Sequence, residues 1–278
     1  MTYRKIANLF YLVPVLFCGA LHVCAQTPTP TPEDGPDFIV PARPGVSNPA
    51  EFQRPGVLQV EFGINANFHS TGNFGEQHDT PLAIRFAVSR RILVELDADA
   101  PYSLKDTNGE RITGVGDTQL GVQVVLQHET RSHPALAIAY YIKLPTASAD
   151  RGLGSGRADH SFFGMVSKNI GKTTVDLNAI YVLAGRTSEK GHDSSGILAV
   201  AASRNLTKRF GIQGELSGLT RNDAQPGAMA GIGAVTYQIS RRAVVDSGFR
   251  VGLTPDTART GFFAGITVGV ADLYKRHH

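Results

Sequence analysis

Residues 56–68, which read GVLQVEFGINANF, decide the fold class. The even-numbered residues from Leu58 to Phe68 are all apolar, whereas the odd-numbered ones are Gln, Glu, Gly or Asn. An alternation with a period of two predicts a β-strand that has one apolar and one polar face. The alternation also lasts long enough to cross a bilayer at a tilt, which takes roughly 9–11 residues.

The same alternation returns along the rest of the chain. It is clear in residues 82–88, 92–98, 120–126, 136–144, 175–183, 210–216, 245–253 and 262–270. Three further runs, around Phe163, Val200 and Ile232, are β-like in composition but do not separate two faces. Together these segments predict about twelve strands, an even number that is typical of bacterial outer-membrane barrels.

The connections between these strands alternate between long and short. The long ones are polar and glycine-rich and are expected at residues 69–79, 100–116, 145–159, 185–194 and 220–227. The short ones are expected at 89–91, 128–133, 168–173, 205–208 and 240–242. This rhythm predicts an all-β, closed antiparallel transmembrane β-barrel with long outer loops and short periplasmic turns.

Residues 1–25 have the features of a cleavable signal peptide. Arg4 and Lys5 precede an apolar stretch at 9–20, and small residues at 23–25 form a cleavage site. Cys24 leaves a lipoprotein open as an alternative, although His22 and Val23 fit a lipid-attachment site poorly. Cys18 and Cys24 are the only cysteines, so the mature chain has neither disulfide nor thiolate chemistry.

The mature composition excludes two classes of protein. Loss of Arg4 and Lys5 lowers the formal net charge from +3 to +1, which offers no case for nucleic-acid binding. No run of 18 apolar residues follows the signal, so helical membrane spans are not expected. An exported chain of this kind is expected in the outer membrane, with a soluble periplasmic barrel or sandwich as the alternative.

The strands are flanked by two further segments. Residues 26–55 are rich in proline and are expected to be an extended periplasmic leader, or to fold into the barrel mouth at 38–40 as a partial plug. Residues 56–274 are assigned to the barrel, and residues 275–278 form a tail. The leader and the tail both lie on the periplasmic side in this scheme.

The strand pattern predicts which side chains face which way, because an Arg or Lys facing lipid near the midplane costs about 2–4 kcal/mol. The charged residues of the polar rows should line the lumen, either as a pore or as a salt-bridge network: Glu61, Arg85, Glu95, Asp97, Lys143, Asp176, Glu215, Asp246 and Arg250. The residues expected to face lipid are Leu58, Val60, Phe62, Ile64, Leu82, Ile84 and Phe86. The lumen set has more acids than bases, which predicts a weak cation preference if the barrel conducts ions.

No enzyme signature emerges from the sequence. His160 and Ser161 are adjacent, so on a strand they point to opposite faces and cannot form a catalytic pair. Gly171, Lys172 and Thr173 lack the upstream glycine of a phosphate-binding loop. The nine histidines are scattered without metal-ligand spacing. We therefore expect no catalytic residue, no metal site and no cofactor.

Several segments carry a resemblance to one family. Arg43-Pro44, Ser47-Asn48 and the strand start at 56–61 match its entry segment, and LAIRFAVSRRILVELD at 82–97 matches its first hairpin. Residues 114–123, 143–148 and 246–253 match as well. The sequence therefore resembles the transporter family of the MetA pathway of phenol degradation across most of residues 38–274. The resemblance implies an outer-membrane β-barrel that transports small hydrophobic or aromatic compounds.

These observations lead to one functional hypothesis and its rivals. The chain is expected to be a passive channel that needs no cofactor, inserted in outer-membrane lipid by the barrel-assembly machinery, with a small-molecule solute that the sequence does not identify. A structural or adhesive barrel sealed by salt bridges is the main alternative. A membrane hydrolase is another, but it requires a Ser–His pair on one face.

Overall fold

The computed structural model describes residues 38–70, 74–105, 108–187, 190–222 and 226–274. Among these residues no helix is long and apolar enough to cross a membrane. The described residues contain one helical element, a short 3-10 turn at Ala149–Arg151. The expected signal peptide and the expected C-terminal tail lie outside the described residues. The strands are β1 (Val57–Ser70), β2 (Phe74–Ala87), β3 (Ile92–Lys105), β4 (Arg111–Gly114), β5 (Thr118–Gln127), β6 (Ala135–Leu144), β7 (Asp159–Ile170), β8 (Thr173–Gly185), β9 (His192–Asn205), β10 (Phe210–Leu219), β11 (Ala228–Ser240), β12 (Ala243–Gly252) and β13 (Thr260–Asp272).

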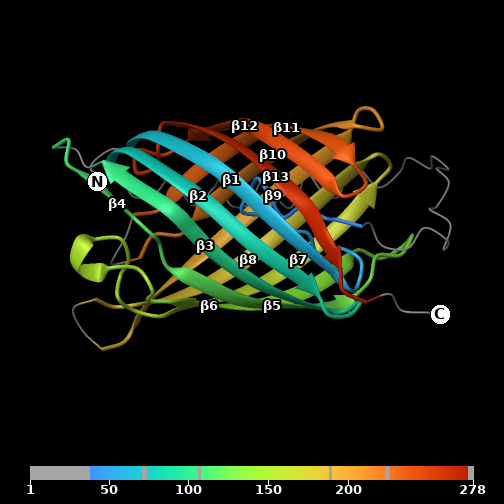
Figure 1. The fold of residues 1–278 in the computed structure, drawn as a ribbon, viewed down its shortest axis with the longest axis horizontal. Coiled ribbons are helices and arrows are strands. Elements are labelled where there is room, and N and C mark those ends of the chain that lie inside the picture. Colours follow the sequence, from blue (N-terminus) through green and yellow to red (C-terminus); the bar gives the residue numbers. More distant parts are fainter. Residues whose placement is uncertain (1–37, 71–73, 106–107, 188–189, 223–225, 275–278) are drawn as a thin grey trace, which may run out of the picture. The chain divides into compact units, whose positions relative to one another are not determined.

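The strands form one closed sheet (Figure 1). Each strand from β6 to β12 pairs with its two sequence neighbours, β5 pairs with β3 and β6, and β2 pairs with β1 and β3. The pairing of β1 with β13 closes the barrel. The short β4 and the longer β5 lie one after the other beside β3, so they fill a single place in the wall. The result is a twelve-position antiparallel barrel, which confirms the predicted fold class.

The register keeps like faces together around the wall. In β1, Phe62 pairs with Leu82 on β2 and with Ile266 on β13, so apolar residues continue from strand to strand. The neighbouring Glu61 pairs with Ala83 and Thr267 on the other face. A slip of one residue would turn every side chain to the wrong face, so this match specifies the pairing.

Residues 38–55 show which face is inside. This single segment forms hydrogen bonds with side chains from strands on all sides of the closed sheet, which is geometrically possible only from within the barrel (Figure 1, blue). The wall residues that bond to it include Gln59 on β1, Gln123 on β5, Ser167 on β7, Asn178 on β8, Glu215 on β10 and Asp246 on β12.

The three runs with unclear faces are strands, and the structure explains the ambiguity. Several of their inward positions hold apolar side chains: Met165 on β7, Ala199 and Ala201 on β9, and Ile232 and Ala234 on β11 are all buried. Their outward positions are apolar too, so the hydrophobic alternation disappears although the strand continues. Part of the inner wall of this barrel is therefore apolar.

Two of the expected outer loops are mostly strand, which corrects the sequence interpretation. β2 begins at Phe74, inside the loop expected at 69–79. β3 continues to Lys105, and β4 (Arg111–Gly114) pairs with its outer end, so the loop expected at 100–116 is largely a hairpin. Beyond the apolar band both faces of a strand meet water, so the ladder continues without the hydrophobic period that would reveal it.

Candidate functional site

An arginine between two glutamates forms the centre of the site. Arg85 on β2 is fully buried, and its Nη1 lies 3.0 Å from Oε1 of Glu61 on β1. Its Nε lies 3.3 Å from Oε2 of Glu95 on β3. Tyr141 on β6 donates its hydroxyl to the same Glu95 oxygen at 3.0 Å. The alternation on β1, β2 and β3 brings these charges together, because each stands at an inward position of adjacent strands.

Wall carboxylates hold the backbone of residues 38–55. Glu61 accepts the N–H groups of Ala42 at 3.0 Å and Arg43 at 3.1 Å. On the far side of the barrel, Glu215 accepts the N–H groups of Val46 and Ser47, both at 2.9 Å. A carboxylate that accepts backbone N–H groups makes strong charge-assisted hydrogen bonds. These contacts fix the path of an extended segment that has no secondary structure of its own.

Amide and hydroxyl side chains complete the grip on this segment. Asn178 on β8 accepts the N–H of Asn48 at 3.0 Å and donates to the Ser47 hydroxyl at 3.0 Å. Gln123 on β5 donates to the carbonyl of Ala50 at 3.0 Å. These polar side chains are buried, so each would cost free energy if it lacked a partner.

The last residues before β1 anchor the segment to the wall. Phe52 is buried against Ala87 on β2, Leu93 on β3 and Val125 on β5. Gln53 donates to the backbone carbonyl of Arg85 at 3.1 Å. Burial of an aromatic ring of this size is one of the larger single contributions to stability, so Phe52 fixes where the segment enters the barrel.

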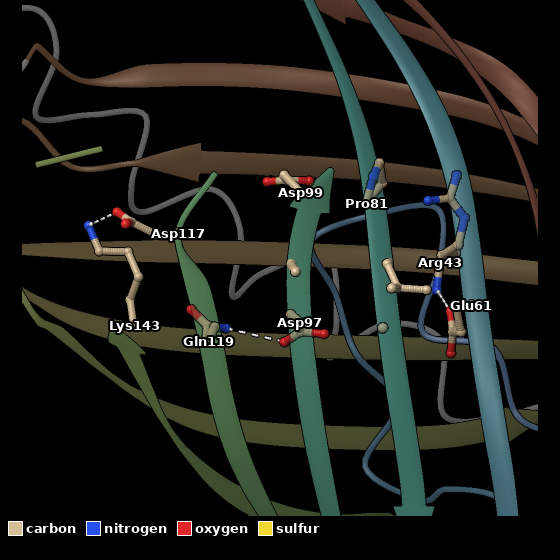
Figure 2. Close-up of a pocket in the computed structure, with 11 residues that line it drawn as sticks. Arg43, Glu61, Pro81, Asp97, Asp99, Asp117, Gln119 and Lys143 are labelled. Carbon is tan, nitrogen blue, oxygen red and sulfur yellow. Dashed lines mark hydrogen bonds and ion pairs between the residues drawn. The ribbon is translucent and has the colours of Figure 1, made fainter. Parts of the chain in front are cut away.

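A cavity of about 380 Å³ lies on the outer side of this network (Figure 2). Lys143 on β6 lies beside it, with its Nζ 3.2 Å from Asp117 and 2.6 Å from Asp159. Gln119 on β5 donates to Asp97 on β3 at 3.5 Å. The cavity is lined by Arg43, Glu61, Pro81, Leu82, Ala83, Asp97, Ala98, Asp99, Asp117, Gln119 and Lys143.

Two patches of the inner wall beside these polar groups are apolar. Ala137 and Ala139 on β6 and Met165 on β7 form a buried cluster with the ring of Tyr141, and Phe163 packs against it. Ala50 of the leader belongs to the same cluster. On β11 and β13, Ile232, Ala234 and Phe263 form a second one. Polar groups that bind the backbone of residues 38–55 thus occur around the interior, with apolar patches between them, and Ala50 contacts one of these patches.

All nine charged residues proposed for the lumen lie on the inner face. Glu61, Arg85, Glu95, Glu215 and Asp246 are buried, while Asp97, Lys143, Asp176 and Arg250 are half-buried. Asp246 lies 3.3 Å from Nε of Arg43, and Asp176 accepts a hydrogen bond from the Ser167 hydroxyl. Whether they line a pore or seal it stays a proposal.

Sequence reasoning missed several residues that contact the leader or the cavity. Gln59, Gln123 and Asn178 stand in the recognised polar rows, and attention to amides as well as charges would have found them. Asp99 and Asp117 stand immediately before and after the loop expected at 100–116, outside the alternating runs at 92–98 and 120–126. Arg43 could not be placed from sequence, because nothing in an extended proline-rich stretch specifies its partner.

The seven residues proposed to face lipid lie on the other side of the wall. Phe62 and Ile64 are 44% and 58% exposed, and Leu58, Val60, Leu82, Ile84 and Phe86 are half-buried. An apolar surface of this extent needs a nonpolar environment.

We expect Phe62→Arg to destabilise the barrel in vesicles by about 2–4 kcal/mol, because it places a charge at mid-strand among acyl chains. Phe210→Arg, at the first residue of β10, is the matched control and should cost roughly 0–1 kcal/mol. The free energy of unfolding follows from a urea titration read by migration of unboiled samples on detergent gels. Equal costs at the two positions would contradict a lipid-facing Phe62.

A family model described as the MetA-pathway of phenol degradation matches residues 42–270. The chain belongs to this family. The match covers the strands, the residues of the site and most of the segment within the barrel.

The fold is shared with solved outer-membrane proteins. An outer-membrane channel from Pseudomonas putida F1 is 13% identical with a TM-score of 0.64, covering 81% of this chain and 98% of its own. The NanC porin is 8% identical with a TM-score of 0.52, covering 76% of this chain and 98% of its own. No curated protein sequence matches the chain significantly. The chain is therefore an outer-membrane β-barrel with a lipid environment around it.

Proposed function

We propose that this barrel is a passive channel for small apolar or aromatic solutes, and that residues 38–55 act as a plug that narrows its lumen. The observation that carries the proposal is how the interior is filled. The lumen is not filled only by contacts between wall side chains. Several wall side chains instead form hydrogen bonds with the backbone of one segment that has no helix or strand. A segment of this kind can move without unfolding the wall.

The apolar patches of the inner wall support the solute class. Ala137, Ala139 and Met165 present a surface on which Ala50 packs, and an aromatic solute could replace that contact. The cavity of about 380 Å³ is larger than a cavity of about 150 Å³ that can hold benzene, but its lining is largely charged, so it bears on the size of the solute and not on its polarity. The family description, which refers to phenol degradation, agrees with this class.

Two measurements test the proposal. Refolded protein in planar bilayers should show small, discrete conductance steps, with the weak cation preference that the inner acids predict. Vesicles that contain the barrel should take up a labelled aromatic acid faster than a sugar of similar size, relative to protein-free vesicles. A silent bilayer together with no uptake would overturn the channel and leave a structural barrel whose lumen is sealed.

A further inference from the structure

The periplasmic turns of the barrel carry a concentration of positive charge. The five turns join β2 to β3, β5 to β6, β7 to β8, β9 to β10 and β11 to β12, so they lie at one rim and are distributed around its circumference. We call their basic residues the periplasmic basic rim: Arg90, Arg91, Arg131, Lys172, Lys208, Arg209, Arg241 and Arg242. The acidic residue within these turns is Glu129.

The positive charge of this rim does not reflect the net charge of the whole protein, because the mature chain is expected to be close to neutral. The outer connections at 106–110, 145–158, 186–191, 220–227 and 253–259 hold basic and acidic residues in similar numbers. The interior contains more acids than bases. The molecule therefore concentrates its positive charge at the rim that faces the periplasm.

The periplasmic basic rim is exposed and largely unpaired. All eight of its residues are exposed. Within the part of the chain that the structure describes, no hydrogen bond or ion pair is formed by the side chains of Arg90, Arg131, Lys172, Lys208, Arg209 and Arg241. Arg242 lies over the ring of Phe38, with its Cζ 4.2 Å from the centroid. Unpaired cations at this density repel one another, so the rim has charge available for an anionic partner.

Apolar side chains beside the same turns locate the rim relative to the membrane. Leu126, Ile170, Leu206 and Ile239 are each at least half exposed, at 51%, 58%, 52% and 50%. Each lies within a turn or at most two residues before one. Apolar residues at this level mark the edge of the hydrocarbon region, and the longer Arg and Lys side chains next to them reach the headgroups.

We propose that the periplasmic basic rim binds the anionic phospholipid headgroups of the inner leaflet of the outer membrane. The distribution of the rim favours lipid over an acidic protein, because basic residues occur in every one of the five turns rather than on one side. A docked protein would need them on one face, whereas a belt of headgroups surrounds the barrel. The inference does not depend on whether the barrel conducts.

The test compares three proteins refolded into vesicles of phosphatidylcholine, with or without roughly one third phosphatidylglycerol. One is the unaltered barrel, and one carries Arg90→Gln, Lys208→Gln and Arg241→Gln, from three different turns. The matched control carries Arg157→Gln, Lys190→Gln and Arg221→Gln in outer connections, with the same change in net charge. The thermal midpoint of each is read from the migration of unboiled samples on detergent gels. Since both leaflets contain the anionic lipid, the orientation of insertion does not affect the comparison.

We expect phosphatidylglycerol to raise the midpoint of the unaltered barrel and of the outer control by about 3–6 °C, and that of the rim variant by less than half as much. The rise should shrink in roughly 0.5 M salt, where charges a few ångström apart are already screened. An equal rise in all three proteins, or none in the unaltered barrel, would overturn the proposal. If the rim variant lacks a midpoint in pure phosphatidylcholine, Arg90→Gln with Arg241→Gln replaces it, and the same two outcomes decide.

Discussion

Deletion of residues 27–50 should raise the single-channel conductance of the barrel roughly five-fold, because conductance grows with the open cross-section of the lumen. The deletion removes the segment held by Glu61, Asn178 and Glu215 but keeps Phe52 and Gln53, which pack at the entry to β1. The exposed carboxylates would then meet water in the lumen rather than an apolar environment, so the wall should remain folded. Their charge should also strengthen the cation preference, measured as the reversal potential in a salt gradient.

A second variant separates an open lumen from a damaged wall. Glu215→Gln with Asp246→Asn weakens the bonds to Val46, Ser47 and Arg43 but leaves the segment in place. This variant should alternate between the conductance of the unaltered barrel and that of the deletion. If the deletion conducts no better than the unaltered barrel while its unboiled gel migration stays that of a folded barrel, the segment does not restrict the channel.

Most of the fold could be predicted because the alternation of apolar and polar residues within each strand reflects lipid on one face and the lumen on the other. The alternation at Leu58 to Phe68 has one cause, an apolar face toward lipid and a polar face inward, and the same cause recurs strand by strand. The prediction was wrong for the strand ends that extend beyond the apolar band. Residues 74–79 and 101–105 are strand above the apolar band, where both faces are wet. The faces of β7, β9 and β11 were obscured because Met165, Ala199 and Ile232 point inward.

The candidate site could be predicted only in part, for a physical reason. The charged inner residues were identifiable because Glu61 and Arg85 interrupt neither the apolar row nor the strand pattern. The groups that bind these residues could not be identified from the sequence. The contacts of Glu215 with Val46 and Ser47 join residues more than 160 positions apart and involve backbone N–H groups, which every residue has. The side chains of the leader give no sign of these contacts, so the sequence left both an extended periplasmic leader and a partial plug as alternatives.

Arg85→Met should destabilise the barrel by about 3–5 kcal/mol, the cost of removing one partner from a buried ion pair. Arg85 is fully buried, and Glu61 and Glu95 lie within 3.3 Å of its guanidinium nitrogens. Without Arg85, the carboxylates of Glu61 on β1 and Glu95 on β3 would face each other across β2, with Asp97 nearby and no buried cation to balance their charge. A urea titration in vesicles, read by unboiled gel migration because the chain has no Trp, gives the free energy of unfolding.

Three comparison variants test whether this loss of stability arises from unbalanced charge. Arg250→Met removes a half-buried arginine from the same inner face and should cost less than about 1 kcal/mol, as expected for a side chain that water can reach. Arg85→Met combined with Glu61→Gln and Glu95→Gln should recover more than half of the lost stability, since replacing all members of a buried ion network is far less costly than removing one. A triple variant no more stable than Arg85→Met would mean instead that the packing of the arginine, rather than its charge, stabilises this part of the barrel. Arg85→Lys separates the contribution of the charge from that of the guanidinium geometry. The lysine keeps the positive charge but cannot reach Glu61 and Glu95 together. The stability of this variant should therefore lie between those of Arg85→Met and the unaltered barrel.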